Sequence, residues 1–206
     1  MKNVVLCGAF ALLLPASLFL GHAAPNAQEK KAAPASEAES FEIDPVHSSV
    51  VFRVQHLETS WFYGRFNHVQ GSLLYDAAKP EVSSISVEIP ADSIDTNSDK
   101  RDQHLKGPDF FNAKEFPTIS FNSTAVKKTK DGLEVEGDLT LHGETQSVTA
   151  RTIHMGRSES AQLGKLAGFT AAFDFKRSDF GMEYGLPDQL GDDVHVEIGI
   201  EAKRRE

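Results

Sequence analysis

Apolar and polar side chains alternate with a period of two along most of this sequence from Phe41 onward. Successive side chains of an extended strand point to opposite faces, so this alternation gives each strand one apolar and one polar face. Such strands pack as antiparallel sheets around a shared interior. The clearest runs lie at 50–55, 84–89, 133–141, 148–152, 169–175 and 194–203. We therefore expect a single all-β core.

Residues that favour turns separate these runs, and they indicate how many strands to expect. The turns are predicted at Ala78–Pro80, Lys130–Gly132, His142–Glu144 and Leu190–Asp192. About eight strands with one inserted helix predict an all-β fold with one or two short helices, an eight-stranded antiparallel barrel that is closed or nearly so. The interior of such a barrel can be filled by side chains or can hold one ligand.

A dense charged segment, 97–121, interrupts the strand pattern and predicts a helix. Asn97 or Ser98 is expected to cap its first free amides, and Asp99 lies where the helix dipole favours a carboxylate. Gly107-Pro108 can neither continue the helix nor donate to it, so the helix ends there. Two adjacent aromatic residues, Phe110 and Phe111, follow at once. They are expected either to rim an apolar cavity or to fill core.

The first 23 residues have the order of a secretory signal peptide. Lys2 precedes the apolar run Val4–Leu20, and the small-residue cleavage site Gly21–Ala23 follows. Residues 24–39 contain no large apolar side chain, which predicts a disordered spacer. Residues 40–205 then form one domain. We expect cleavage after Ala23, a periplasmic or secreted protein, and no membrane span after cleavage.

Charge and cysteine usage exclude several classes of function. The chain carries 21 Lys and Arg against 30 Asp and Glu, a formal net charge of −9, and loss of Lys2 with the leader would make it −10. This balance argues against nucleic acid or an anionic membrane surface as the main partner. The only cysteine, Cys7, lies in the predicted leader. Disulfides, cysteine–metal sites and cysteine nucleophiles are therefore not expected in the mature chain.

Whether the interior is packed or hollow stays open on the residue pattern alone. Phe169, Phe173 and Phe175 are expected to point inward from one strand, with Ala171 on the same face. Gly137 interrupts an inward row on another strand. Large and small residues that alternate inward are compatible with tight packing and also with a narrow apolar bore.

Several segments together resemble the YceI-like family of lipid- and polyisoprenoid-binding proteins. They are FEIDPVHSSVVFRVQHL at 41–57, GRFNHVQGSLLYD at 64–76, the cassette RDQHLKGPDFFN at 101–112, GDLTLHGETQSVTA at 137–150 and GFTAAFDFKRSDFGM at 168–182. The resemblance covers 41–203 in the expected order and spacing. It implies a lipocalin-like barrel with an apolar tunnel for an isoprenoid or another long amphiphilic chain, in a protein that is commonly exported and often a homodimer. A polar loop between Gly156 and Leu166, where Leu163 or Leu166 is a lid or an anchor, departs from the pattern.

With this resemblance, a tunnel is favoured over a packed core. The apolar residues expected to line it are Phe52, Val54, Phe66, Phe110, Phe111, Phe121, Phe169, Phe173 and Phe175. Three basic side chains, Arg101, His104 and Arg177, are candidates for a head-group rim, because guanidinium groups bind phosphate in a bidentate manner. The alternative is that the arginines form ordinary surface ion pairs with Asp102, Asp174 or Asp179.

The alternative hypothesis for the function is a periplasmic enzyme or a metal-dependent barrel. Its site would lie at the rim and be formed by scattered His, Asp and Arg residues. Asp44, His47, Ser48 and Ser49 lie close together, but no nucleophile elbow surrounds either serine. A turn that these side chains pin explains the cluster better. The histidines are scattered singly, without a metal-binding pair. We expect no catalytic residue, no metal site and no cofactor, and hence a non-catalytic carrier of lipid.

Overall fold

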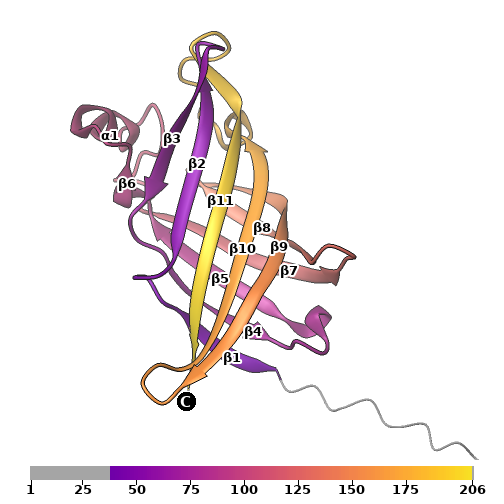
Figure 1. The fold of residues 1–206 in the computed structure, drawn as a ribbon. Coiled ribbons are helices and arrows are strands. Elements are labelled where there is room, and N and C mark those ends of the chain that lie inside the picture. Colours follow the sequence, from indigo (N-terminus) through magenta and orange to yellow (C-terminus); the bar gives the residue numbers. More distant parts are fainter. Residues whose placement is uncertain (1–37, 206) are drawn as a thin grey trace, which may run out of the picture. The chain divides into compact units, whose positions relative to one another are not determined.

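The computed structural model describes residues 38–205, which form a closed eight-stranded antiparallel β-barrel (Figure 1). The predicted signal peptide and residues 24–37 of the predicted spacer lie outside the described residues. No helix within the described range is long and apolar enough to cross a membrane.

Eleven strands, one α-helix and three short 3₁₀ helices make up this domain. The helix is α1 (Asp99–Leu105), and the 3₁₀ helices are Pro80–Val82, Ala91–Ser93 and Arg177–Phe180. The strands are β1 (Glu39–Ile43), β2 (Ser49–His56), β3 (Ser60–Phe66), β4 (Gln70–Tyr75), β5 (Ser84–Pro90), β6 (Ile94–Asp95), β7 (Thr118–Lys128), β8 (Leu133–Leu141), β9 (Glu144–Ser160), β10 (Gly164–Lys176) and β11 (Leu190–Arg204).

Three of the barrel's eight positions are each occupied by two short strands in succession. Strands β1 and β2 both pair with β11, at opposite ends of it, and their partners on the other side are β4 and β3. Strands β5 and β6 in turn pair with β4 and β3. The remaining strands follow the order β5–β7–β8–β9–β10–β11, and the pairing of β1 with β11 closes the ring. The predicted antiparallel barrel is confirmed.

Glycines let two large rings lie against the barrel wall. Gly64 pairs with Phe52 across β2 and β3, and a Cβ at Gly64 would lie 2.3 Å from Cζ of that ring. A Cβ at Gly137 would likewise lie 2.4 Å from Cζ of Phe121. Each ring therefore occupies the space that a side chain on the neighbouring strand would fill. The rings of Phe52 and Phe121 therefore lie along the barrel wall and do not extend into the centre of the barrel.

The helix forms where the charged segment predicts it, but its N-terminus is stabilised differently. Ser98 holds the N-cap position without a side-chain hydrogen bond to the helix. Instead, the buried carboxylate of Asp102 accepts hydrogen bonds from the Thr96 amide, at 3.0 Å, and from the Thr96 hydroxyl. The expected side-chain cap is therefore wrong, because Asp102 ties the first helical turn to the preceding strand.

Three boundaries also differ from the sequence prediction. Strand β1 begins at Glu39, inside the predicted spacer, because that carboxylate lies within 3.3 Å of both Lys165 and Arg204 and is also bonded to Arg157. The predicted loop at 156–166 is mostly strand, since β9 and β10 continue through it and leave only a tight turn. The predicted turn Leu190–Asp192 is the irregular start of β11.

Candidate functional site

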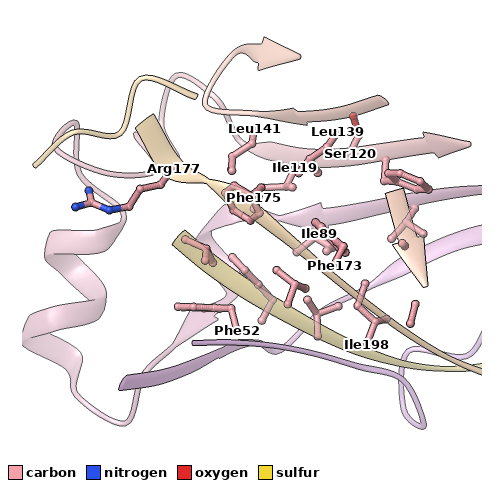
Figure 2. Close-up of a pocket in the computed structure, with 18 of the residues that line it drawn as sticks. Phe52, Ile89, Ile119, Ser120, Leu139, Leu141, Phe173, Phe175, Arg177 and Ile198 are labelled. Atoms are coloured by element: carbon pink, nitrogen blue, oxygen red, sulfur yellow. The ribbon is translucent and has the colours of Figure 1, made fainter. Parts of the chain in front are cut away.

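The barrel encloses an apolar cavity of about 590 Å³. Its wall is formed by side chains of β2, β3, β4, β5, β7, β8, β9, β10 and β11, together with Phe110 and Phe111 after α1. Figure 2 shows part of this wall, with Phe52, Phe173 and Phe175 among the residues that border the cavity. A volume of this size lies within the range of sites that hold a small organic ligand. The barrel interior thus contains a cavity, which favours a hollow interior over one filled by side chains.

Every apolar residue that the sequence placed in a tunnel lies on the wall of this cavity. They are Phe52, Val54, Phe66, Phe110, Phe111, Phe121, Phe169, Phe173 and Phe175. The structure thus brings together residues from β2, β3, β7, β10 and the segment after α1. That these side chains contact a ligand stays a prediction.

Ring contacts fix the shape of the wall. The Phe66 ring lies 5.7 Å from that of Phe52 and 5.6 Å from that of Phe111, measured between centroids. On β10, the rings of Phe173 and Phe175 are stacked at 6.2 Å. Aromatic pairs at such distances add to the stabilisation from burial alone. The segment after α1 is therefore packed onto the strand wall and forms part of the cavity.

Exposed lining residues show where the cavity opens. Most of them lie at one end, on the β2–β3 hairpin, on α1 and in the loop before β11: His56, Ser60, Trp61, Arg101, His104, Tyr184 and Gln189. The amide of Leu57 donates to the carbonyl of Gln189 at 3.0 Å, which ties the hairpin tip to that loop. We call this opening the mouth. Arg101 and His104 of the helix lie at this opening, and Phe110 and Phe111 border the cavity.

Two of the predicted head-group residues lie at the mouth, but both already have partners. Arg101 donates from Nε to the Thr96 hydroxyl at 2.8 Å and from Nη2 to the Thr96 carbonyl, and its guanidinium lies 4.4 Å from the centroid of the Phe62 ring. Nε2 of His104 lies 2.9 Å from a carboxylate oxygen of Asp109, and its ring packs on Phe110 and Tyr184. Direct contact of either side chain with a head group stays a prediction.

Arg177 has a structural role that the sequence did not reveal. It is buried, and it donates to three backbone carbonyls: Nε to Gly191 at 2.9 Å, Nη1 to Met182 at 2.8 Å and Nη2 to Leu190 at 3.1 Å. Burial lowers its pKa, although the carboxylate of Asp192 partly offsets this. Arg177 therefore pins the loop between Arg177–Phe180 and β11.

The surface ion pairs considered for the arginines are wrong. Asp102 is buried and bonded to Thr96, whereas Asp174 pairs with Nδ1 of His195. Arg177 is enclosed by carbonyls and is no surface ion. Both arginines position loop backbone at the same end of the barrel.

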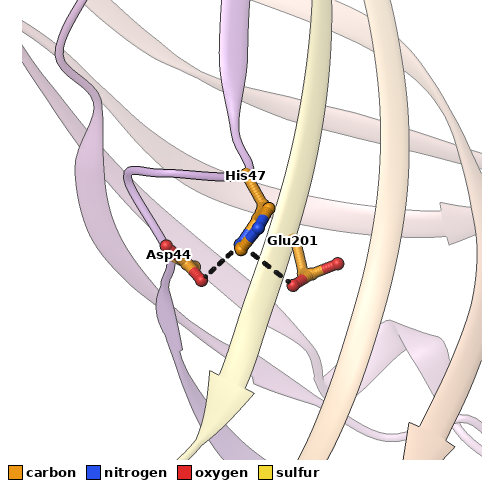
Figure 3. Close-up of side chains that lie close together, drawn as sticks. All are labelled: Asp44, His47 and Glu201. Carbon is orange, nitrogen blue, oxygen red and sulfur yellow. Dashed lines mark hydrogen bonds and ion pairs between the residues drawn. The ribbon is translucent and has the colours of Figure 1, made fainter. Parts of the chain in front are cut away.

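Asp44, His47 and Glu201 lie together where the chain bends between β1 and β2 (Figure 3). Nδ1 of His47 is 2.8 Å from Asp44 and 3.5 Å from Glu201, both measured to carboxylate oxygens. These hydrogen bonds and charges raise the pKa of His47, and the bonds from His47 and the Val46 amide lower the pKa of Asp44. The three groups have the donors and spacing that could hold a cation, but none of them lines the cavity.

The hydroxyl of Ser48 explains why this cluster is a pinned turn. It donates to the carbonyl of Glu201 at 3.2 Å and accepts from the amide of Glu201 at 3.1 Å. The Asp44 amide donates to the same carbonyl at 2.8 Å. These bonds attach the bend to β11 and confirm the turn that the sequence predicted.

His142 is also held in a turn by a backbone contact. Its Nδ1 lies 2.9 Å from the carbonyl of Phe180, as expected for a turn residue.

Sequence reasoning missed several residues at the mouth. Trp61 and Tyr184 line the cavity, yet their segments carry no motif that predicts this. The apolar row of β11, Val194, Val196, Ile198 and Ile200, also lines it. Its period of two was the available signal for that strand.

Comparisons with known proteins agree on one family. The family model described as "YceI-like domain" matches residues 41–202. Protein YceI of Salmonella newport is 39% identical over 155 residues, which cover 75% of this chain and 81% of the relative. A UPF0312 protein of Pseudomonas aeruginosa is 35% identical over 192 residues, covering 92% of this chain and 97% of the relative.

Solved structures share the barrel. A YCEI protein of Campylobacter jejuni has a TM-score of 0.64 and 27% identity, and the match covers 74% of this chain and 90% of the other. Burkholderia cenocepacia BcnA has a TM-score of 0.72 at 22% identity, covering 78% and 99% of the two chains. A polyisoprenoid binding domain from Saccharophagus degradans has a TM-score of 0.57 at 14% identity, covering 81% and 99%. The last two likenesses concern the fold alone.

Proposed function

This chain belongs to the YceI-like family, and we propose that it is an exported, non-catalytic carrier that holds an isoprenoid or another long-chain amphiphilic lipid in its barrel. The observation that carries the proposal is the apolar cavity of about 590 Å³ that opens at the mouth. The family resemblance and the name of the Saccharophagus degradans neighbour support the same ligand class. Export rests on the order of Lys2, the apolar run and the small residues at 21–23.

Burial of apolar surface supplies the affinity. At roughly 25 cal/mol per Å², a chain of several isoprene units gains on the order of 10 kcal/mol before the cost of association. The tail needs no hydrogen bonds, so the cavity selects for the length and girth of an apolar chain. The polar end of the ligand is expected at the mouth, where Arg101 and His104 lie on α1.

The carrier proposal is tested by what co-purifies and by what the cavity takes up. Protein purified from its own cell envelope is examined by native mass spectrometry and then extracted with organic solvent, and we expect an amphiphile in the extract. Ligand-stripped protein is then titrated with a fluorescent prenyl probe.

A variant that fills the cavity makes this test specific. Ala171 lines the cavity between Phe169 and Phe173 on β10. Ala171→Trp is expected to abolish uptake of the probe while the protein stays folded by circular dichroism. An empty extract, together with no uptake by the stripped wild type, would refute the carrier function.

A further inference from the structure

Exposed apolar side chains surround the mouth. Leu57 at the tip of the β2–β3 hairpin is 53% exposed, Trp61 on β3 is 42% exposed, and Tyr184 in the loop before β11 is 46% exposed. Trp61 and Tyr184 also border the cavity. The exposed surface and the cavity wall are continuous at Tyr184, whereas the Trp61 ring turns toward Arg53, at 4.5 Å, and His195, at 4.9 Å, which alternate with the cavity-lining residues of β2 and β11. We refer to Leu57, Trp61 and Tyr184 as the mouth rim. Figure 1 shows the hairpin of β2 and β3 and the loop that leads into β11 at the same end of the barrel.

The backbone at the hairpin tip shows that Leu57 is an unfavourable choice for local structure. Leu57 and Glu58 have φ values of +50° and +51°, and the Thr59 amide donates to the His56 carbonyl at 3.0 Å. Two-residue turns of this kind strongly favour Asn, Asp or Gly. Burial favours leucine only weakly here, since 53% of its surface is exposed. A large apolar side chain is therefore held in solvent at a position where glycine is more stable.

The cations near the mouth are each engaged with a neighbour and do not form a cluster. The guanidinium of Arg53 lies 4.5 Å from the centroid of the Trp61 ring. Arg101 is bonded to Thr96, and His104 is paired with Asp109. Glu58 lies next to Leu57, and Glu183 lies next to Tyr184. Attraction to anionic lipids needs clustered cations near the surface. The rim instead carries aromatic rings with one polar edge, which favour the interface between lipid and water.

From these observations we propose that the mouth rim docks the barrel on the surface of a zwitterionic lipid bilayer, with Leu57, Trp61 and Tyr184 inserted among the head groups. The inference rests on the proposed carrier function. An isoprenoid that leaves a membrane loses about 0.8 kcal/mol for each CH₂ group exposed to water. A mouth that touches the bilayer lets the chain slide into the cavity without that exposure. Three side chains give weak and reversible binding, as a carrier that must leave again requires.

Trp61 is the only tryptophan in the chain, which makes it a built-in reporter for this docking. Full-length mature protein is mixed with phosphatidylcholine vesicles whose acyl chains carry bromine, and the quenching of Trp61 emission is measured together with flotation of the protein. We expect quenching and partial flotation. We also expect neither to increase when anionic lipid is added, nor to fall when salt is raised, because the rim carries no cationic cluster.

Two variants separate docking from folding. Leu57→Gly relieves the left-handed backbone, so thermal stability should stay equal or rise, while binding to the vesicles falls several-fold. Val82→Asp is the matched control, since Val82 is 47% exposed in the 3₁₀ helix Pro80–Val82 and does not line the cavity. Its vesicle binding should equal that of the wild type.

The outcomes that overturn docking differ from those that overturn the carrier. Docking is refuted if brominated vesicles do not quench Trp61 emission. If the protein still takes up a soluble fluorescent prenyl alcohol in that case, the carrier function is unaffected. Binding that needs anionic vesicles, or that Val82→Asp weakens as much as Leu57→Gly, also refutes docking. A third outcome also refutes docking on a bilayer: the wild type forms dimers, Leu57→Gly dissociates them, and neither protein binds vesicles. The mouth rim would then contact a second copy of the chain. Failure to take up the prenyl alcohol without vesicles refutes the carrier alone.

Discussion

Phe173 and Phe180 make a matched pair for deciding whether the wall of this barrel is a ligand site or a core. Both rings contact Phe175: Phe173 stacks on it at 6.2 Å, and Phe180 meets it edge-on at 5.2 Å. Phe180 is 1% exposed and fully enclosed by protein, whereas Phe173 is only partly buried and borders the cavity. The same substitution, Phe→Ser, should therefore cost much less stability at Phe173 than at Phe180.

The expected free energies follow from what surrounds each ring. Truncation of a fully packed phenylalanine costs about 3–5 kcal/mol, because the residual cavity loses its contacts. At Phe173 the space already exists, so the loss is the aromatic contact, about 0.5–1.5 kcal/mol, plus part of the burial. We expect Phe173→Ser to lower the free energy of unfolding by about 1–2 kcal/mol, and Phe180→Ser by at least about 3 kcal/mol.

Binding should show the reverse order. A hydroxyl at position 173 faces the ligand chain without a hydrogen-bond partner, at a cost of about 1–3 kcal/mol. This corresponds to a loss of affinity of about fivefold to 150-fold for a fluorescent prenyl probe. Urea unfolding of ligand-stripped protein measures the first quantity, and titration with the probe measures the second. If Phe173→Ser unfolds the protein as Phe180→Ser does, and the wild type takes up no lipid, the interior behaves as packed core and the carrier reading is wrong.

Three further predictions concern turns and charges. Gly143→Val should lower the free energy of unfolding by about 1–3 kcal/mol, since Gly143 has φ +82° and its Cβ would lie 2.5 Å from the Phe116 ring; melts equal to the wild type would contradict this. Arg177→Met leaves three carbonyls without their donor and should cost about 3–5 kcal/mol, with faster proteolysis between 182 and 190 as the check. The raised pKa of His47 adds stability that is present below pH 6.5 and lost as the pH rises through the folded-state value. The difference in melting temperature between the wild type and His47→Gln should therefore be present at pH 5 and absent at pH 9; a difference that persists at pH 9 would contradict it.

The strands and the helix could be predicted because their signals are local. A period of two along β10 places Phe169, Phe173 and Phe175 on one face, and only closure of the sheet is then needed to point that face inward. The segment after α1 was predicted for the same reason, since paired aromatics that follow a charged helix have to contact apolar surface. These residues line the cavity as expected.

The role of Arg177 could not be read from the sequence because its partners are backbone carbonyls. The carbonyls of Met182, Leu190 and Gly191 come together only through the path of one loop, which no side-chain pattern encodes. The mouth was missed for a related reason. Trp61 and Tyr184 are far apart in the chain, and they share the mouth because β2 pairs with β11 and the Leu57 amide is bonded to Gln189.

Whether the barrel is hollow depends on pairs of residues on neighbouring strands. Phe52 faces Gly64 across two strands, and the ring of Phe121 covers Gly137, so each large ring is accommodated within the wall. Had both partners been large, their side chains would have met in the lumen and filled it. The wall side chains therefore lack contacts on one side, and such missing contacts weaken dispersion attraction. A bound chain restores them, so in the carrier reading the ligand completes the hydrophobic core, and occupancy and stability rise together.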